Sequence, residues 1–262
     1  MKALIFAAGL GTRLKPITDS IPKALVKVGG DPLLKHTICN LKNNGFNNIV
    51  INIHHFPQQI KDYLSANNNF GINITLSDES NLLRDTGGGI KYAAPLINDN
   101  EPFLVHNVDI LSNLNLLDFY NFHLSNSISI DTPLATLLVS NRETQRYFLF
   151  DQENNLVGWM NQLSGEIKSP YKELCRLKDN NFNPHEFLKS NSLNKYAFGG
   201  VHILSPSVFN LMQSFPDKFS IVDFYVQMAD KYIIKGYIKN DLEMVDVGKL
   251  DTLDEAQEFL RR

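Results

Sequence analysis

A glycine-rich loop with two spaced cations lies near the start of this 262-residue chain. The apolar run ALIFAA leads directly into Gly9 and Gly11, and Arg13 and Lys23 follow. A glycine-rich loop can point several backbone N–H groups toward one place and so bind phosphate oxygens. The Arg13 guanidinium suits bidentate phosphate contact, and the Lys23 ammonium adds a point charge. The pattern indicates a polyphosphate site, and its alternative is a strand turn with two solvated cations.

Two common phosphate motifs are absent from this loop. The pattern GxxxxGK[ST] does not occur, and GxGxxG would need glycine where Leu14 stands. Pro16 and Pro22 prevent a long helix from starting directly after the loop. The loop is therefore neither a P-loop nor a dinucleotide fingerprint.

Two aspartates far apart in the chain, Asp109 and Asp246, each follow a short apolar run. Open α/β sheets bind ligands at the carboxyl ends of their strands. Magnesium prefers one or two carboxylates together with phosphate oxygens and water. An aspartate at a strand end can also form a turn or cap a helix, so the residue types alone leave both interpretations open.

The elements that must position these residues alternate between strand-like and helix-like patterns. Strand runs such as KALIFAA, IVINI, INITLS and PFLVHNVD are separated by helical patterns, the last of which we expect to start just after three glycines. Residues 140–195 alternate short strand candidates with turn residues and then become polar. We predict an α/β fold with a Rossmann-like, mostly parallel sheet flanked by helices, and a small antiparallel insertion or lid.

The composition limits the function. Net charge is −3 without a block of like charges, which predicts a small-molecule partner and neither nucleic acid nor membrane. Cys39 and Cys175 fit no metal or disulfide framework, and no stretch approaches the ~20 apolar residues of a membrane span. We expect a cytoplasmic protein with one domain spanning residues 1–262.

The stretch FAAGLGTRLKPITDSIPKALVKVGGDPLL resembles the opening signature of the sugar-1-phosphate nucleotidyltransferases, also called nucleotide-diphospho-sugar pyrophosphorylases. The resemblance continues through DTGGGIKYAAPLI, FLVHNVD, FGGVHIL and MVDVGKLDTLDEA. The triple glycine and VDVG look most like N-acetylmuramic acid α-1-phosphate uridylyltransferases and their mannose-1-phosphate guanylyltransferase-like neighbours. The resemblance implies the nucleotide-diphospho-sugar transferase fold, with residues 1–112 as the nucleotide-binding half and 113–262 as the sugar-phosphate-binding half.

The resemblance also implies roles for individual residues. It makes Arg13 and Lys23 catalytic and assigns Mg²⁺ to Asp109 and Asp246, although Val108 stands where the family usually has glycine. The implied nucleotide-binding residues are Ala7, Ala8, Gly9, Leu10, Gly11, Thr12, Thr86, Gly87 and Gly88. The implied sugar-phosphate-binding residues are Asn161, Glu166, Gly199 and Gly200. The structural alternative for residues 86–89 is a turn and the start of a helix. The alternative for Gly199 and Gly200 is a bulge in a strand.

The implied reaction joins a nucleoside triphosphate and a sugar-1-phosphate to give an NDP-sugar and pyrophosphate. The preferred pair is UTP with N-acetylmuramic acid 1-phosphate, which gives UDP-MurNAc, a cell wall precursor made in peptidoglycan recycling. Alternatives are GTP with mannose-1-phosphate, CTP with a phospho-alcohol, and a catalytically inactive nucleotide-sugar sensor. We expect a monomer.

Overall fold

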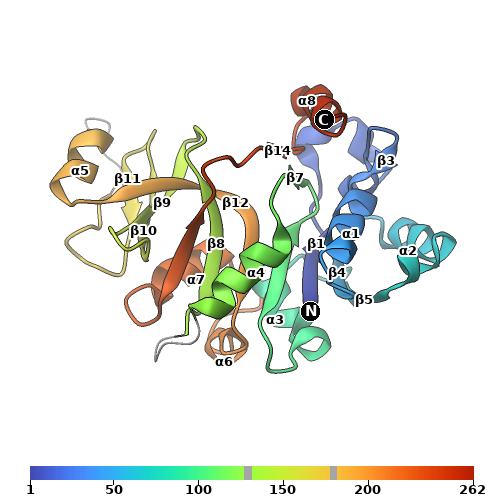
Figure 1. Ribbon diagram of the computed structural model, residues 1–262, viewed down its shortest axis with the longest axis horizontal. Coiled ribbons are helices and arrows are strands. Elements are labelled where there is room, and N and C mark those ends of the chain that lie inside the picture. Colours follow the sequence, from blue (N-terminus) through green and yellow to red (C-terminus); the bar gives the residue numbers. More distant parts are fainter. Residues whose placement is uncertain (127–131, 178–181) are drawn as a thin grey trace.

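A ten-stranded sheet extends along the long axis of the molecule in the computed structural model, which describes residues 1–126, 132–177 and 182–262 (Figure 1). Its main path runs in the order β11-β10-β9-β12-β6-β1-β4-β5, and β8 pairs with both β12 and β13. The strands are β1 (Lys2–Phe6), β4 (Asn48–Ile53), β5 (Asn73–Asp78), β6 (Phe103–Asn107), β8 (Ala135–Ser140), β9 (Arg146–Phe150), β10 (Leu156–Asn161), β11 (Glu166–Lys168), β12 (Asn194–Leu204) and β13 (Ile234–Ile238).

The strands β5, β4, β1 and β6 form the parallel half of the sheet. They are connected through α1 (Leu33–Asn43), α2 (Pro57–Ala66) and α3 (Asp85–Ile97), which confirms the predicted α/β alternation. Two small antiparallel pairs lie apart from this sheet. They are β2 (Lys27–Val28) with β3 (Asp31–Pro32), and β7 (Ile110–Ser112) with β14 (Met244–Asp246).

Two apolar cores cover the two faces of the sheet. One core contains side chains of α1, α2, α4 (Leu116–Ser125) and α8 (Leu253–Phe259). The other contains side chains of α3, α6 (Val208–Met212) and α7 (Ile221–Met228). Along β1, Ala3 and Ile5 enter the first core and Leu4 the second, because successive strand residues point to opposite faces. Burial on both faces explains why this strand is apolar from Ala3 to Phe6.

The antiparallel insertion continues the main sheet. Its strand β9 pairs with both β10 and β12, and β11 extends the edge beyond β10. A third, smaller core lies beneath these strands and includes Phe187 of α5 (Pro184–Ser190), the helix at the far end of the molecule from α2 (Figure 1). Residues 178–181 of the predicted insertion lie outside the described part of the chain.

One predicted boundary is wrong. The helix α3 begins at Asp85, so Gly87, Gly88 and Gly89 lie inside its first turns and not before it. The three glycines are buried there, and their lack of side chains allows other segments of the same chain to approach closely. Among the described residues, no helix has both the length and the apolar character needed to cross a membrane.

Candidate active site

The glycine-rich loop leaves β1 and turns sharply at Gly11. This residue has φ +64°, and a Cβ there would lie 2.8 Å from the Thr18 Cγ2 atom. The Gly11 carbonyl oxygen accepts hydrogen bonds from the Leu14 N–H and the Thr18 hydroxyl, both at 2.8 Å. The N–H groups of Leu10 and Gly11 bond to no other described residue, so they remain available to an anion.

Two buried polar residues outside the sequence motifs, Asn52 and Glu79, hold the base of this loop. Asn52 Oδ1, from β4, accepts the N–H groups of Ala7 at 2.7 Å and Ala8 at 3.2 Å. Asn52 Nδ2 donates to Glu79 Oε1 at 2.9 Å, and Glu79 Oε2 accepts the Arg84 N–H at 3.1 Å. Burial raises the pKa of Glu79. Ala7 and Ala8 therefore anchor the loop, and their predicted contact with a nucleotide stays a prediction.

The two predicted metal aspartates lie together beside Lys23. The Lys23 ammonium pairs with Asp109 Oδ2, and both side chains are largely buried. Strand β14 pairs Asp246 with Ile110, and the Val247 N–H donates to the Asp109 carbonyl oxygen at 2.8 Å. Burial, followed by the nearby Asp109 carboxylate, raises the pKa of Asp246. The fold thus brings three of the predicted charged residues to one point.

Arg13 approaches the same point from the glycine-rich loop. A Cβ on Gly248 would lie 2.6 Å from both Arg13 Nη2 and Asp246 Oδ1, so the glycine leaves room for this approach. Val108 is buried in the core, and its N–H donates to the Phe6 carbonyl oxygen at 3.2 Å, which keeps the strand end in place.

The aspartate pair fits a divalent cation. Asp246 Oδ1 is buried and has no hydrogen-bond partner among the described residues. A cation would satisfy this oxygen and offset the repulsion between the two carboxylates. No group of three or more metal-ligating side chains occurs in the described ranges. Magnesium does not need one, since one or two carboxylates suffice when phosphate oxygens and water complete its shell.

A cavity of about 450 Å³ connects the loop to the start of α3. Gly9, Lys23 and Asp109 line it together with Thr86 and Lys218.

Gly87 and Gly88 do not line this cavity. Their N–H groups donate to the Phe219 carbonyl oxygen at 2.9 and 3.2 Å, and a Cβ on Gly87 would lie 2.3 Å from the Phe219 ring. The structure gives them a packing role, and their nucleotide contact stays a prediction.

The predicted sugar-phosphate residues fall into two places. Asn161 and Glu166 face each other across the β10–β11 pair and line a separate cavity of about 470 Å³ with Arg146. Gly199 and Gly200 are buried in a bulge of β12.

Gly200 lies next to the loop-side cavity. It has φ +71°, and a Cβ there would lie 2.8 Å from Asn107 Nδ2. Asn107 lines the 450 Å³ cavity, so Gly200 touches its wall, whereas Asn161 and Glu166 do not.

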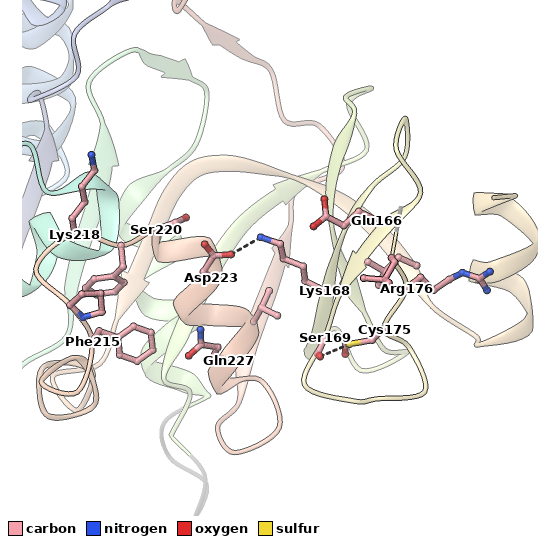
Figure 2. Close-up of a pocket in the computed structure, with 15 residues that line it drawn as sticks. Glu166, Lys168, Ser169, Cys175, Arg176, Phe215, Lys218, Ser220, Asp223 and Gln227 are labelled. Atoms are coloured by element: carbon pink, nitrogen blue, oxygen red, sulfur yellow. Dashed lines mark hydrogen bonds and ion pairs between the residues drawn. The ribbon is translucent and has the colours of Figure 1, made fainter. Parts of the chain in front are cut away.

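A larger groove of about 1110 Å³ separates the insertion from α7 (Figure 2). Lys168 Nζ and Asp223 Oδ1 form an ion pair across it at 3.0 Å. The Cys175 thiol donates to the Ser169 carbonyl oxygen at 2.9 Å. Figure 2 shows Lys218 pointing away from Phe215, and Lys218 also lines the 450 Å³ cavity, so the two spaces adjoin there.

The comparisons place the chain among nucleotidyltransferases. Residues 2–162 match the family model described as "Nucleotidyl transferase", and the chain belongs to this family. The predicted family is therefore confirmed. N-acetylmuramate alpha-1-phosphate uridylyltransferase of Neisseria meningitidis serogroup B is 45% identical over 114 residues, which are 44% of this chain and 49% of that protein. The match thus covers about half the length of this relative.

Two longer matches extend over nearly the whole chain. Mannose-1-phosphate guanyltransferase of Saccharomyces cerevisiae is 28% identical over 253 residues, 95% of this chain and 62% of that protein. The solved structure of the inositol-1-phosphate CTP transferase from T. maritima has a TM-score of 0.70 at 17% identity, covering 100% of this chain and 96% of that one. This structural likeness confirms the predicted fold.

Proposed function

We propose that this chain joins a nucleoside triphosphate to a sugar-1-phosphate and releases pyrophosphate. A phosphate oxygen of the sugar-1-phosphate bonds to the α-phosphorus of the triphosphate. The bond from the α-phosphorus to the bridging oxygen breaks, and its electron pair leaves with pyrophosphate. The observation that carries this proposal is the convergence of the glycine-rich loop, Lys23 and the Asp109–Asp246 pair.

In this reaction the protein aligns the two substrates and neutralises their negative charge. The attacking phosphate oxygen is already an anion, so the protein need supply neither a base nor a covalent nucleophile. The N–H groups of residues 10–12 and the Arg13 guanidinium bind the β- and γ-phosphates, and Lys23 lies where the phosphates of the two substrates meet. Asp109 and Asp246 would hold Mg²⁺, which supplies positive charge at the α-phosphate when bound.

We propose UTP and N-acetylmuramic acid 1-phosphate as the substrates, which makes the product UDP-MurNAc, a cell wall precursor. The 45% identity to the uridylyltransferase of N. meningitidis supports this pair. The 95% coverage by the yeast guanyltransferase supports GTP with mannose-1-phosphate as the second candidate. CTP with a phospho-alcohol is a third, by likeness of fold to the T. maritima enzyme.

A matrix of substrates tests the function. Four nucleoside triphosphates are combined with N-acetylmuramic acid, N-acetylglucosamine, mannose and glucose 1-phosphates and with phosphocholine, and pyrophosphate release is measured with Mg²⁺. Highest kcat/KM for UTP with N-acetylmuramic acid 1-phosphate supports the first pair, and another preferred pair replaces it. Binding of nucleotide without pyrophosphate release from any pair contradicts the enzyme and favours the nucleotide-sugar sensor.

We also propose how the two halves of the chain divide the substrates. Residues 1–112 form the nucleotide half and 113–262 the sugar-phosphate half, with Asn161, Glu166, Gly199 and Gly200 on the sugar side. We expect a cytoplasmic monomer. Light scattering of the purified chain measures its mass directly, and a dimer mass contradicts the monomer.

A further inference from the structure

A small cavity of about 200 Å³ lies next to Asp246 and is lined by three cations. Arg13, Arg142 and Lys249 contribute the positive charges, and Asp246 and Glu255 are the acids in its wall. The three cations come from three separate segments: the glycine-rich loop, the connection between β8 and β9, and the turn after β14. None of the three forms a salt bridge within the described part of the chain.

Within residues 1–126, 132–177 and 182–262, one hydrogen bond holds the Arg142 guanidinium. Its Nη2 donates to the Phe198 carbonyl oxygen on β12 at 3.2 Å. A guanidinium has five N–H donors, so most of them remain for another partner. Lys249 directly follows Gly248, the glycine that leaves room for Arg13 beside Asp246. Like charges repel, and this excess of positive charge therefore favours an anion in the cavity.

The position of Arg13 indicates which anion this is. Arg13 lies two residues after Gly11, at the end of the loop whose free N–H groups suit phosphate. The α-phosphate belongs near Lys23 and Asp109, so the outer phosphates extend toward Arg13. We propose that Arg142 and Lys249 join Arg13 in binding the β- and γ-phosphates, and so the leaving pyrophosphate; this assignment rests on the proposed function. The charge that pyrophosphate gains when the bond breaks is stabilised by these cations.

The competing anion is the phosphate of the sugar-1-phosphate. Arg142 is tied to β12, the strand that also carries Gly199 and Gly200 of the predicted sugar side. The two assignments differ in which Michaelis constant depends on Arg142.

Kinetics of the reverse reaction separate them. In Arg142→Gln and Lys249→Gln, the KM for pyrophosphate should rise at least about tenfold, while the KM for the NDP-sugar stays within about twofold. Arg142→Lys should recover part of the loss, because it keeps the charge without the bidentate geometry. The control Lys231→Gln removes one exposed charge that lines none of these cavities and should match the wild type. A raised KM for the NDP-sugar or the sugar-1-phosphate with an unchanged KM for pyrophosphate overturns the assignment.

Calorimetry with pyrophosphate and Mg²⁺ tests the same site without turnover. Arg142→Gln and Lys249→Gln should bind pyrophosphate at least about tenfold more weakly than the wild type. Equal binding by both variants, with thermal unfolding unchanged, overturns the assignment. A wild type that binds pyrophosphate through these residues but turns over no substrate pair contradicts the proposed function alone.

Discussion

The N–H of Val247 donates to the carbonyl oxygen of Asp109 at 2.8 Å, which joins the backbones that carry the two aspartates. This bond and the β7–β14 pairing hold Asp246 close to the Asp109 carboxylate. The arrangement is unfavourable in itself, because burial and the neighbouring charge both raise the pKa of Asp246. A bound cation would remove this cost, which supports the proposed role of the pair as cation ligands.

Asp246→Asn is expected to separate stability from activity. The variant removes the carboxylate repulsion, so in chelator at neutral pH its free energy of unfolding should be higher than that of the wild type. Turnover should fall by about a hundredfold or more, because one preorganised charge is lost. Urea denaturation and pyrophosphate release measure the two effects. Asp251→Asn, at an exposed position, is the control, and a less stable Asp246→Asn contradicts the repulsion argument.

Lys23→Ala and Arg13→Ala should each lower turnover by about a hundredfold or more. Lys23 lies against Asp109 and Arg13 lies beside Asp246, so each variant removes positive charge where we propose that the phosphates bind. Lys15→Ala is the matched control from the same segment: its side chain is 59% exposed and pairs with Asp19. The rates are measured by pyrophosphate release at saturating substrate. Near-normal rates in both site variants contradict the proposed mechanism.

Asn52→Leu should destabilise the fold by about 3 kcal/mol, because it leaves the Ala7 and Ala8 N–H groups and a Glu79 oxygen without their partner. It should also weaken nucleotide binding, since the glycine-rich loop starts at those two N–H groups. Asn73→Ala removes an exposed asparagine hydrogen bond to Asn48 and should change stability by less than about 0.5 kcal/mol. Urea denaturation that shows equal losses in both variants contradicts the anchoring role of Asn52.

Local patterns predicted the parallel half of the sheet because β1, β4 and β6 are buried almost throughout and therefore read as apolar runs. The helices between them show hydrophobic residues at helical spacing. The long opening signature likewise indicated Arg13 and Lys23, and the stretch FLVHNVD indicated Asp109. Asn52 gave a weaker signal, a polar residue inside the apolar run IVINI, but its partners lie in other segments. No local sequence pattern indicated Arg142. The position of its side chain depends on a contact with Phe198, which only the folded chain makes.

The buried glycines of α3 were also beyond local prediction, since what they contact comes from residues far along the chain. Gly88→Ala should cost about 1–3 kcal/mol, because its Cβ would lie 2.3 Å from the Asp217 carbonyl oxygen and the backbone must move. Gly9→Ala is the matched control, since a Cβ there has no neighbour within 4 Å. Thermal and urea unfolding compare the two, and a fully stable Gly88→Ala contradicts the close packing of α3 on residues 217–219.

Three buried histidines should make the fold sensitive to acid. Burial lowers the pKa of His106 and His123 to about 4 and that of His202 to about 3, below the ordinary value of 6.5. Their folded-state pKa is depressed, so the unfolded chain binds more protons. The free energy of unfolding that these neutral histidines contribute is fully present above pH 6.5. It is lost as the pH drops from 6.5 toward 4. Each histidine contributes up to about 1.4 kcal/mol per pH unit.

His123→Gln tests this dependence on one residue. The His123 ring bonds to the Thr136 hydroxyl at 2.8 Å and the Ser205 hydroxyl at 3.2 Å, and glutamine can keep one such contact without a titrating group. Urea denaturation at pH 7.5, 6.5, 5.5 and 4.5 should show a shallower loss of stability in the variant than in the wild type. His185→Gln, at an exposed position on α5, should keep the wild-type profile. A His123→Gln profile parallel to that of the wild type between pH 6.5 and 4.5 would show that His123 takes up its proton in the folded state.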